Sequence, residues 1–282
     1  MLDQPRNADQ RYLEKDTRLT GLLFDWTGTI IDFGSRAPAK AFMRAFEESS
    51  IQITQAEARA PMGLSKWEHI ESILRLPRIT KSWNQIYARE WTNIDIAMIY
   101  ERFLPLQAET AAAYSGVVSG AITAFQNARA RNLKIGVVSD YPEKVTNLIA
   151  ARARGQGLEA DAYASAGDTP MGQPLPFLLY KIALELELGA IWKCVAIGDT
   201  PIGIEAARKA GAWTVGVAIS GNAAGLSPEE WLATGEIDRG RLRKSASASL
   251  NAAGAHFVID SITGLSAVLT RLESRLARGE RP

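Results

Sequence analysis

The sequence has a single cysteine, Cys194, among its 282 residues. One cysteine excludes an internal disulfide framework and is typical of proteins in a reducing compartment, so we expect a cytoplasmic location. Cys194 opens an apolar run of residues, which favours a buried structural thiol over a reactive one.

The sequence also lacks an excess of charge of either sign. Its 32 basic and 31 acidic side chains leave a formal net charge of +1, so nothing in the composition indicates a nucleic-acid or membrane partner. No stretch approaches the roughly 20 apolar residues that span a bilayer. The polar N-terminus, residues 1–18, does not have the pattern of a secretory signal. With 46% apolar residues, the chain can instead bury a sizeable core.

Short apolar runs without polar alternation recur along the chain and predict buried parallel strands. These runs cover residues 21–24, 135–139, 194–197, 213–217 and 257–259. Helical patterns cover residues 120–131, 143–154, 176–188, 202–210 and 262–278. Strands that alternate with helices predict an α/β fold, here a Rossmann-like parallel sheet with helices on both faces.

The region after the first strand breaks this rhythm. It contains helical patterns at residues 39–48, 66–74, 83–91 and 95–110 and no convincing strand. We therefore predict a core of residues 1–36 and 114–282 and an inserted all-helical cap of residues 37–113. Such a cap lies over the carboxyl ends of the strands, where open α/β sheets bind ligands. The polar segment 221–246 is expected to be a surface excursion with a helix start near Ser227.

Aspartates follow several of the predicted strands. Asp25 follows the first strand and precedes a turn at Gly28, and Asp199 follows the strand at 194–197. Asp25 alone is equally consistent with a simple turn residue. Because the carboxyl ends of parallel strands converge, Asp25 and Asp199 together predict an oxygen site of the kind that Mg²⁺ favours. The Ser139 hydroxyl and nearby backbone N–H groups are candidate phosphate donors.

These residues resemble the motifs of the haloacid-dehalogenase superfamily, in the same order along the chain. The resemblance implies that Asp25 attacks phosphorus and forms an aspartyl-phosphate. It also implies that Mg²⁺ is bound by Asp25, by the backbone carbonyl of Thr27 and by Asp199. Phosphatases of this superfamily usually have a second aspartate, which protonates the leaving oxygen, at the position of Thr27. A threonine cannot act as that acid, so the leaving group is expected to be activated differently.

The predicted cap offers another activation. Lys66 and His69 stand at positions i and i+3 of a predicted helix, on one face. A partly desolvated lysine can form a Schiff base with an aldehyde. The protonated imine withdraws electrons, and cleavage of a C–P bond next to a carbonyl carbon requires such a sink. A lysine in the cap would therefore make the missing acid unnecessary.

The same region resembles the phosphonoacetaldehyde hydrolase (phosphonatase) family. That resemblance implies a Lys66 iminium with phosphonoacetaldehyde, proton shuttling by His69 and Met62, attack by Asp25, and release of acetaldehyde and phosphate from a homodimer built through the caps. Ser139, Tyr141, Gln173 and Gly28 are expected to bind the substrate and its phosphate group. The matching residues are Phe24-Asp25-Trp26, Gly28-Thr29, Ala58-Arg59, Pro61-Met62-Gly63-Leu64, Lys66, His69, Ala210-Gly211, Trp213-Thr214-Val215-Gly216 and Gly254-Ala255-His256-Phe257.

Two positions depart from the phosphonatase pattern. The family has arginine in a Gly-Arg-Pro context where this sequence has Gln173, and it has glycine where this sequence has Asp140. One lost cation and one gained anion could each cost roughly a few kcal/mol of transition-state stabilisation. Two alternatives therefore remain open. One is a Mg²⁺-dependent phosphomonoester hydrolase of the superfamily, and the other is a catalytically weakened or ligand-binding relative with another substrate.

Overall fold

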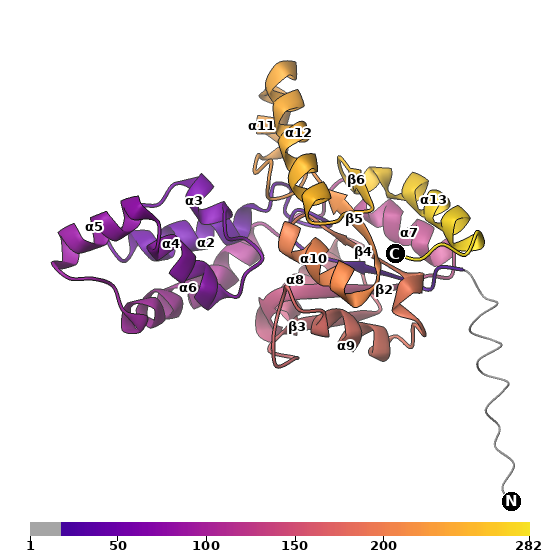
Figure 1. Ribbon diagram of the computed structural model, residues 1–282, viewed down its shortest axis with the longest axis horizontal. Coiled ribbons are helices and arrows are strands. Elements are labelled where there is room, and N and C mark those ends of the chain that lie inside the picture. Colours follow the sequence, from indigo (N-terminus) through magenta and orange to yellow (C-terminus); the bar gives the residue numbers. More distant parts are fainter. Residues whose placement is uncertain (1–17) are drawn as a thin grey trace, which may run out of the picture.

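The computed structural model describes residues 18–282, and its core is a parallel β-sheet covered by helices (Figure 1). Residues 1–17, which include most of the segment expected to lack a secretory pattern, lie outside the described residues. The order of the described strands in the sheet is β3-β2-β1-β4-β5-β6. Their bounds are Gly21–Phe24 (β1), Lys134–Pro142 (β2), Ala162–Ala166 (β3), Cys194–Gly198 (β4), Trp213–Val217 (β5) and Phe257–Ile259 (β6).

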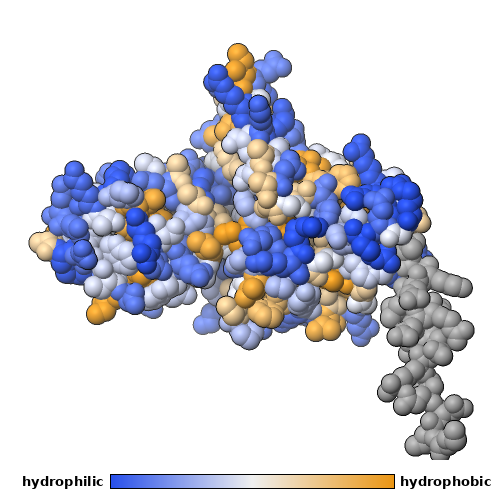
Figure 2. Space-filling view, viewed as in Figure 1, coloured by the Kyte–Doolittle hydropathy of each residue, from blue (hydrophilic) through white to orange (hydrophobic). Residues whose placement is uncertain are grey.

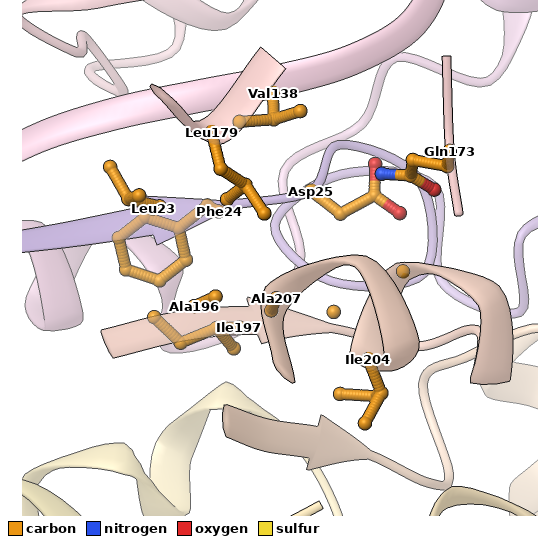
Figure 3. A pocket seen from close by; sticks show the side chains of 12 residues that line it. Leu23, Phe24, Asp25, Val138, Gln173, Leu179, Ala196, Ile197, Ile204 and Ala207 are labelled. Atoms are coloured by element: carbon orange, nitrogen blue, oxygen red, sulfur yellow. The ribbon is translucent and has the colours of Figure 1, made fainter. Parts of the chain in front are cut away.

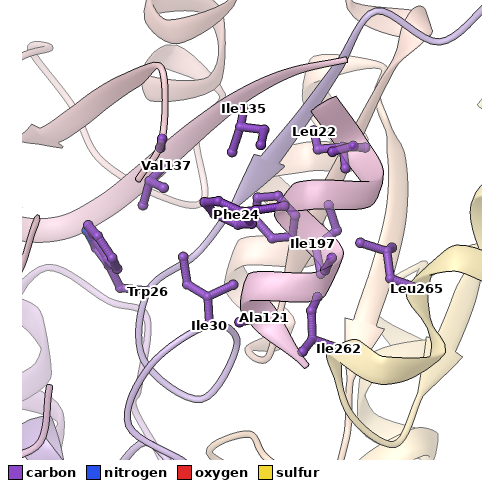
Figure 4. Close-up of a cluster of buried hydrophobic side chains, with 14 of the residues drawn as sticks. Leu22, Phe24, Trp26, Ile30, Ala121, Ile135, Val137, Ile197, Ile262 and Leu265 are labelled. Carbon is purple, nitrogen blue, oxygen red and sulfur yellow. The ribbon is translucent and has the colours of Figure 1, made fainter. Parts of the chain in front are cut away.

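The central strand β1 is buried on both faces, which explains why its sequence does not alternate. Leu22 and Phe24 belong to the cluster under α7 (Ala121–Ala130), α8 (Glu143–Gly155) and α13 (Leu265–Ala277) (Figure 4). Leu23 belongs to the opposite cluster, under α9 (Phe177–Glu185) and α10 (Pro201–Ala210). Burying each such side chain stabilises the fold by about 1.5–3 kcal/mol. The expected α/β fold with helices on both faces is confirmed.

A group of helices between β1 and β2 has a hydrophobic cluster of its own, which includes Phe42, Ile70 and Phe103. Two connections join it to the core, and they pair with each other: the N–H of Asp32 donates to the Gly116 carbonyl at 2.9 Å. Figure 2 shows that the visible surface of this group is mostly hydrophilic. We call α2–α6 the cap helices: α2 (Arg36–Glu47), α3 (Gln55–Arg59), α4 (Lys66–Leu74), α5 (Pro77–Tyr87) and α6 (Asn93–Ala113).

Three elements differ from the sequence expectations. Strand β3 was missed because Ala-Tyr-Ala-Ser-Ala lacks the β-branched residues that mark strands. Helix α5 covers Pro77–Tyr87 rather than 83–91, since Pro77 at its first turn begins it earlier. Helix α12 (Glu236–Ala252) occupies much of the expected surface excursion. Its sequence shows little periodicity because only Ala246 and Leu250 are buried.

The short helix α3 was also not predicted, because its five residues cover little more than one turn; the other expected helices and strands are present. Ser227 caps α11 (Pro228–Ala233) by accepting a hydrogen bond from the Glu230 N–H, and η1 (Ile191–Lys193) and η2 (Ile262–Gly264) are short 3₁₀ turns. Cys194 is buried, and burial raises the pKa of its thiol to about 11. Among the described helices, none combines the length and the apolar character that crossing a bilayer requires.

Candidate active site

Asp25 directly follows β1, at the carboxyl edge of the sheet. Its N–H still donates to the Ile197 carbonyl at 2.9 Å, so the sheet pairing continues up to this residue and fixes its backbone. Its Oδ1 accepts a hydrogen bond from the Trp26 N–H at 2.7 Å. Figure 3 shows the Asp25 carboxylate and the Gln173 amide facing each other at one end of a mostly apolar pocket.

Asp199 follows β4, the strand that pairs with β1, and it is 1% exposed. Its Oδ2 accepts a hydrogen bond from the Asn222 N–H at 2.7 Å. Its Oδ1 is buried and has no hydrogen-bond partner among the described residues. The turn after Asp25 touches this carboxylate, since a Cβ on Gly28 would lie 2.2 Å from Asp199 Oδ2. Gly28 also has a φ of 71°, so both space and backbone conformation favour glycine here.

The two buried carboxylates lie close enough to affect each other's ionisation. Burial raises the pKa of Asp199 to about 7. Burial, followed by the charges of Asp199 and Asp140, raises the pKa of Asp25 well above its ordinary range. Ionising both groups is therefore costly unless a cation lies beside them.

A divalent cation fits these residues. The unpaired Asp199 Oδ1, the Asp25 carboxylate and the backbone oxygens of the turn at Thr27 are the oxygen ligands that Mg²⁺ prefers, and Mg²⁺ usually keeps several waters besides. The described residues contain no group of three or more His, Cys, Asp or Glu side chains that could hold a metal, so water and carbonyl oxygens would have to complete the shell. The Thr27 hydroxyl accepts a hydrogen bond from Ser35 at 3.2 Å.

Two further predicted residues lie at the end of β2. Ser139 is buried, and its Oγ accepts hydrogen bonds from the Tyr141 N–H at 3.1 Å and from Thr146 Oγ1 at 3.2 Å. The hydrogen of the Ser139 hydroxyl is then available to a ligand. Tyr141 is also buried, and burial raises the pKa of its phenol well above the ordinary value, so it stays neutral.

Lys66 enters the site from the cap. It is the first residue of α4, whose start is fixed by Ser65 accepting a hydrogen bond from the Glu68 N–H. A cation in the first turn is disfavoured by the helix dipole by about 0.3–1 kcal/mol, so helix stability does not explain this lysine. It is only 8% exposed, and its Nζ lies 2.5 Å from Asp140 Oδ2, on the core strand β2.

His69 and Met62 lie in the interior of the cap. His69 stacks on Phe42 with 3.7 Å between ring centroids, and its Nε2 donates to the Ala58 carbonyl at 2.9 Å. Its Nδ1 is buried without a partner among the described residues. Burial, with Lys66 nearby, lowers the pKa of His69 to about 3, so the ring is neutral. Met62 is 5% exposed and belongs to the hydrophobic cluster of the cap.

The turn that carries Met62 rests on the core. A Cβ on Gly63 would lie 2.9 Å from Ile202 Cβ and 3.4 Å from Thr200 Oγ1, immediately after Asp199. Asp25, Ser139 and Asp199 thus lie at the ends of β1, β2 and β4, and Gln173 follows β3. Lys66 reaches the end of β2, where it pairs with Asp140. Lys181, eight residues beyond Gln173, does not supply the missing cation, since it pairs with Asp168 at 3.1 Å and with Glu185 at 3.3 Å.

Sequence reasoning missed a connection between cap and core. Arg59 at the end of α3 donates to the carbonyls of Gly34 at 2.8 Å and Gly225 at 3.1 Å, and to Asn222 Oδ1 at 3.0 Å. Asn222 is the residue whose N–H holds Asp199. The position of the cap is therefore linked to a carboxylate of the site. The only signal in the sequence was the Ala58-Arg59 pair in the family resemblance.

Comparison with known proteins agrees with this geometry. Residues 19–211 match the family model of haloacid dehalogenase-like hydrolases. The phosphonoacetaldehyde hydrolase of Bordetella pertussis is 42% identical over 265 residues, which cover 94% of this chain and 96% of that protein. The phosphonoacetaldehyde hydrolase of Paraburkholderia phytofirmans is 39% identical over 261 residues, covering 93% of this chain and 98% of that protein.

A solved structure is similar over the same extent. The crystal structure of a phosphonoacetaldehyde hydrolase like protein from Oleispira antarctica superposes with a TM-score of 0.91 at 40% sequence identity. The match covers 94% of this chain and 96% of that chain, so it includes both the sheet and the cap helices.

Proposed function

The chain belongs to the haloacid dehalogenase-like hydrolases and, within them, to the phosphonoacetaldehyde hydrolases, and from this premise we propose that it hydrolyses the C–P bond of phosphonoacetaldehyde to acetaldehyde and phosphate. The observation that carries the proposal is the place of Lys66. A cap lysine that is 8% exposed and bonded to the end of β2 is poised for an aldehyde held over the ends of the core strands.

In the proposed reaction Lys66 acts on carbon. Its Nζ adds to the aldehyde carbon of the substrate, and loss of water leaves a protonated imine. The imine draws electrons from the C–P bond when that bond breaks, so the leaving group is an enamine rather than an unstabilised carbanion. Hydrolysis of the resulting acetaldehyde imine frees Lys66.

Asp25 acts on phosphorus. Its carboxylate attacks the phosphoryl group opposite the leaving carbon and forms an aspartyl-phosphate, which water then hydrolyses. Ser139 and the Gln173 amide supply hydrogen bonds to the phosphoryl oxygens, and the Gly28 turn keeps Asp199 beside Asp25. A Mg²⁺ bound by Asp25, Asp199 and the Thr27 carbonyl would offset the negative charge of the phosphoryl group and of the two carboxylates.

The cap residues around Lys66 have supporting roles in this proposal. His69 is neutral and hydrogen-bonded to the Ala58 carbonyl. Together with Met62 it forms the wall beside the Lys66 amine and helps to direct proton transfer there. Tyr141 lies with its ring centroid 5.7 Å from Lys66 Nζ and forms another wall of the substrate site.

A phosphomonoester hydrolase is less well supported by the same geometry. An ester oxygen must be protonated as it leaves, and the position two residues after Asp25 holds Thr27. Thr27 is 9% exposed, and its hydroxyl accepts a hydrogen bond from Ser35 and is not a carboxylic acid that could protonate a leaving group.

The assembly and location are further parts of the proposal. We divide the chain into a catalytic core of residues 1–36 and 114–282 and a cap of residues 37–113, and we propose a homodimer formed through the caps. Two exposed apolar residues of the cap, Ile86 at 49% and Ile94 at 79%, support that interface. The buried, unpaired Cys194 is consistent with a cytoplasmic protein.

The test is a product assay with phosphonoacetaldehyde. Phosphate and acetaldehyde should appear in equal amounts, and their release should require Mg²⁺. Asp25→Ala and Lys66→Ala should each lower the rate by orders of magnitude. Phosphate release from nitrophenyl phosphate or sugar phosphates that outpaces the phosphonate reaction, and that persists in Lys66→Arg, would favour the phosphomonoester reading instead.

A further inference from the structure

The ion pair between Lys66 and Asp140 joins two parts of the molecule that are 74 residues apart in sequence. Lys66 comes from the first turn of α4 in the cap, and Asp140 comes from β2 in the core. Within the described part of the chain this is the one ion pair of the Lys66 amine. The reaction proposed above uses Lys66 and Asp25 and assigns no role to Asp140, although Asp140 contacts the nitrogen that must attack the substrate.

We propose that Asp140 is the acid–base group of imine formation at Lys66. This inference rests on the proposed function, because it assigns a proton acceptor and donor to the imine that the function requires. A lysine in an ion pair is an ammonium, which has no electron pair to offer, so a base must remove a proton before attack. Asp140 Oδ2, at 2.5 Å from Nζ, already shares a hydrogen with it.

Asp140 takes one proton from the Lys66 ammonium, and the free electron pair of Nζ forms the bond to the aldehyde carbon while the carbonyl pair moves to oxygen. That oxygen takes a second proton from the nitrogen and becomes a hydroxyl. Asp140 then returns its proton to the hydroxyl, the C–O bond breaks, and water leaves. The products are a protonated imine on Lys66, one water molecule and the Asp140 carboxylate.

The other groups near Lys66 are less suited to accept and return a proton during imine formation. The Nε2 hydrogen of His69 is committed to the Ala58 carbonyl, and the ring is fully buried against Phe42, away from water. Tyr141 is a buried neutral phenol. Asp25 is needed at phosphorus. His69 holds a proton poorly, since its pKa is lowered to about 3.

Asp140 also has the access to water that the step requires. Its side chain is 32% exposed, whereas that of Lys66 is 8% exposed. The carboxylate can therefore exchange protons with solvent between turnovers, and the water that leaves the carbinolamine has a route outward on the Asp140 side. Once the imine has formed, the same carboxylate lies beside a cation of unchanged charge, so the ion pair survives the reaction.

The experiment measures imine formation apart from C–P cleavage. In Asp25→Asn the nucleophile for phosphorus is gone, so incubation with phosphonoacetaldehyde and cyanoborohydride should leave a phosphonoethyl group on the Lys66 peptide. The rate of this labelling is followed by mass spectrometry in Asp25→Asn alone, with Asp140→Asn added, and with Asp140→Gly added. Glu109→Gln, which breaks the exposed cap ion pair with Arg44, is the matched control.

We expect Asp140→Asn to slow the labelling by about 10²-fold or more, and Glu109→Gln to leave it unchanged. Formate should restore much of the rate in Asp140→Gly, where it can enter the vacated space, and little in Asp140→Asn. A role in the stability of the cap alone would not give this rescue. Labelling of Asp140→Asn at the rate of its parent, or faster, would overturn the assignment of Asp140 alone. Absence of label in Asp25→Asn itself would remove the Lys66 imine, and the role of Asp140 with it.

Discussion

Replacing Arg59 with methionine removes the contact that ties the cap to the core beside the active site. The guanidinium donates to the Gly34 and Ser35 carbonyls at 2.8 and 3.0 Å, to Asn222 Oδ1 at 3.0 Å and to the Gly225 carbonyl at 3.1 Å. These acceptors lie on core loops, while Arg59 lies on α3 of the cap. Methionine keeps much of the side-chain volume and loses every one of these donors.

The magnitude follows from the number and exposure of these bonds. A hydrogen bond from a charged donor contributes about 1.5–3 kcal/mol. Arg59 is partly exposed, so water replaces some of the lost donors, and we count the equivalent of about two unreplaced bonds, or about 3 kcal/mol. A change of that size shifts the equilibrium between a docked and an undocked cap by about 10²-fold. Asn222 Oδ1 would also lose its donor, although Asn222 Nδ2 still donates to the backbone carbonyl of residue 59, and this loosens the N–H that holds Asp199.

Steady-state phosphate release and limited proteolysis measure this effect together. In Arg59→Met we expect kcat/KM for phosphonoacetaldehyde to fall about 10²-fold, with faster cleavage of the connections near residues 32 and 116. Arg59→Lys, which keeps the charge without the planar fork, should lie in between. Arg44→Met, which breaks an exposed pair within the cap, is the control. Arg59→Met with kinetics within twofold of the wild type would refute the reasoning.

Three further predictions concern single residues of the site. His69 stays neutral when folded, with a pKa lowered to about 3 from 6.5, so below pH 6.5 the unfolded chain binds a proton that the folded His69 does not. Between pH 6.5 and 5 the wild type should therefore lose about 2 kcal/mol of stability in urea relative to His69→Gln, and the same pH dependence in both proteins would contradict this. Gly28→Ala places a Cβ 2.2 Å from Asp199 Oδ2, so phosphate release should require a higher Mg²⁺ concentration for half-saturation and its maximal rate should fall about 10²-fold. A half-saturating Mg²⁺ concentration equal to that of the wild type is the opposing result. Gln173→Arg adds a cation facing Asp25, and kcat/KM should rise about tenfold, whereas a fall would mean that charge does not limit the reaction.

The sequence predicted those parts of the fold that burial determines locally. Strand β1 is buried on both faces, so its residues form an unbroken apolar run that periodicity detects. Strand β3 and helix α12 escaped detection for the opposite reason. The residues of β3 are mostly small, and α12 buries only Ala246 and Leu250, so neither has a strong pattern.

The site was predictable to the extent that strand ends reveal it. Asp25 and Asp199 each follow an apolar run, and the convergence of parallel strands places them together without further information. Lys66 required the family resemblance, because a lysine at a helix start is usually a surface residue. Its partner Asp140 and the link from Arg59 to Asn222 depend on how the cap sits on the core, over separations of 74 and 163 residues that local patterns do not encode.

The most direct test of the central claim is a chemical trap on the wild-type enzyme. Incubation with phosphonoacetaldehyde, Mg²⁺ and cyanoborohydride, followed by peptide mass mapping, reports which nitrogen carries the substrate carbon. We predict an ethyl group on Lys66, because C–P cleavage on the imine removes the phosphoryl group before reduction. Full turnover of the phosphonate with an unmodified Lys66 peptide would contradict the account.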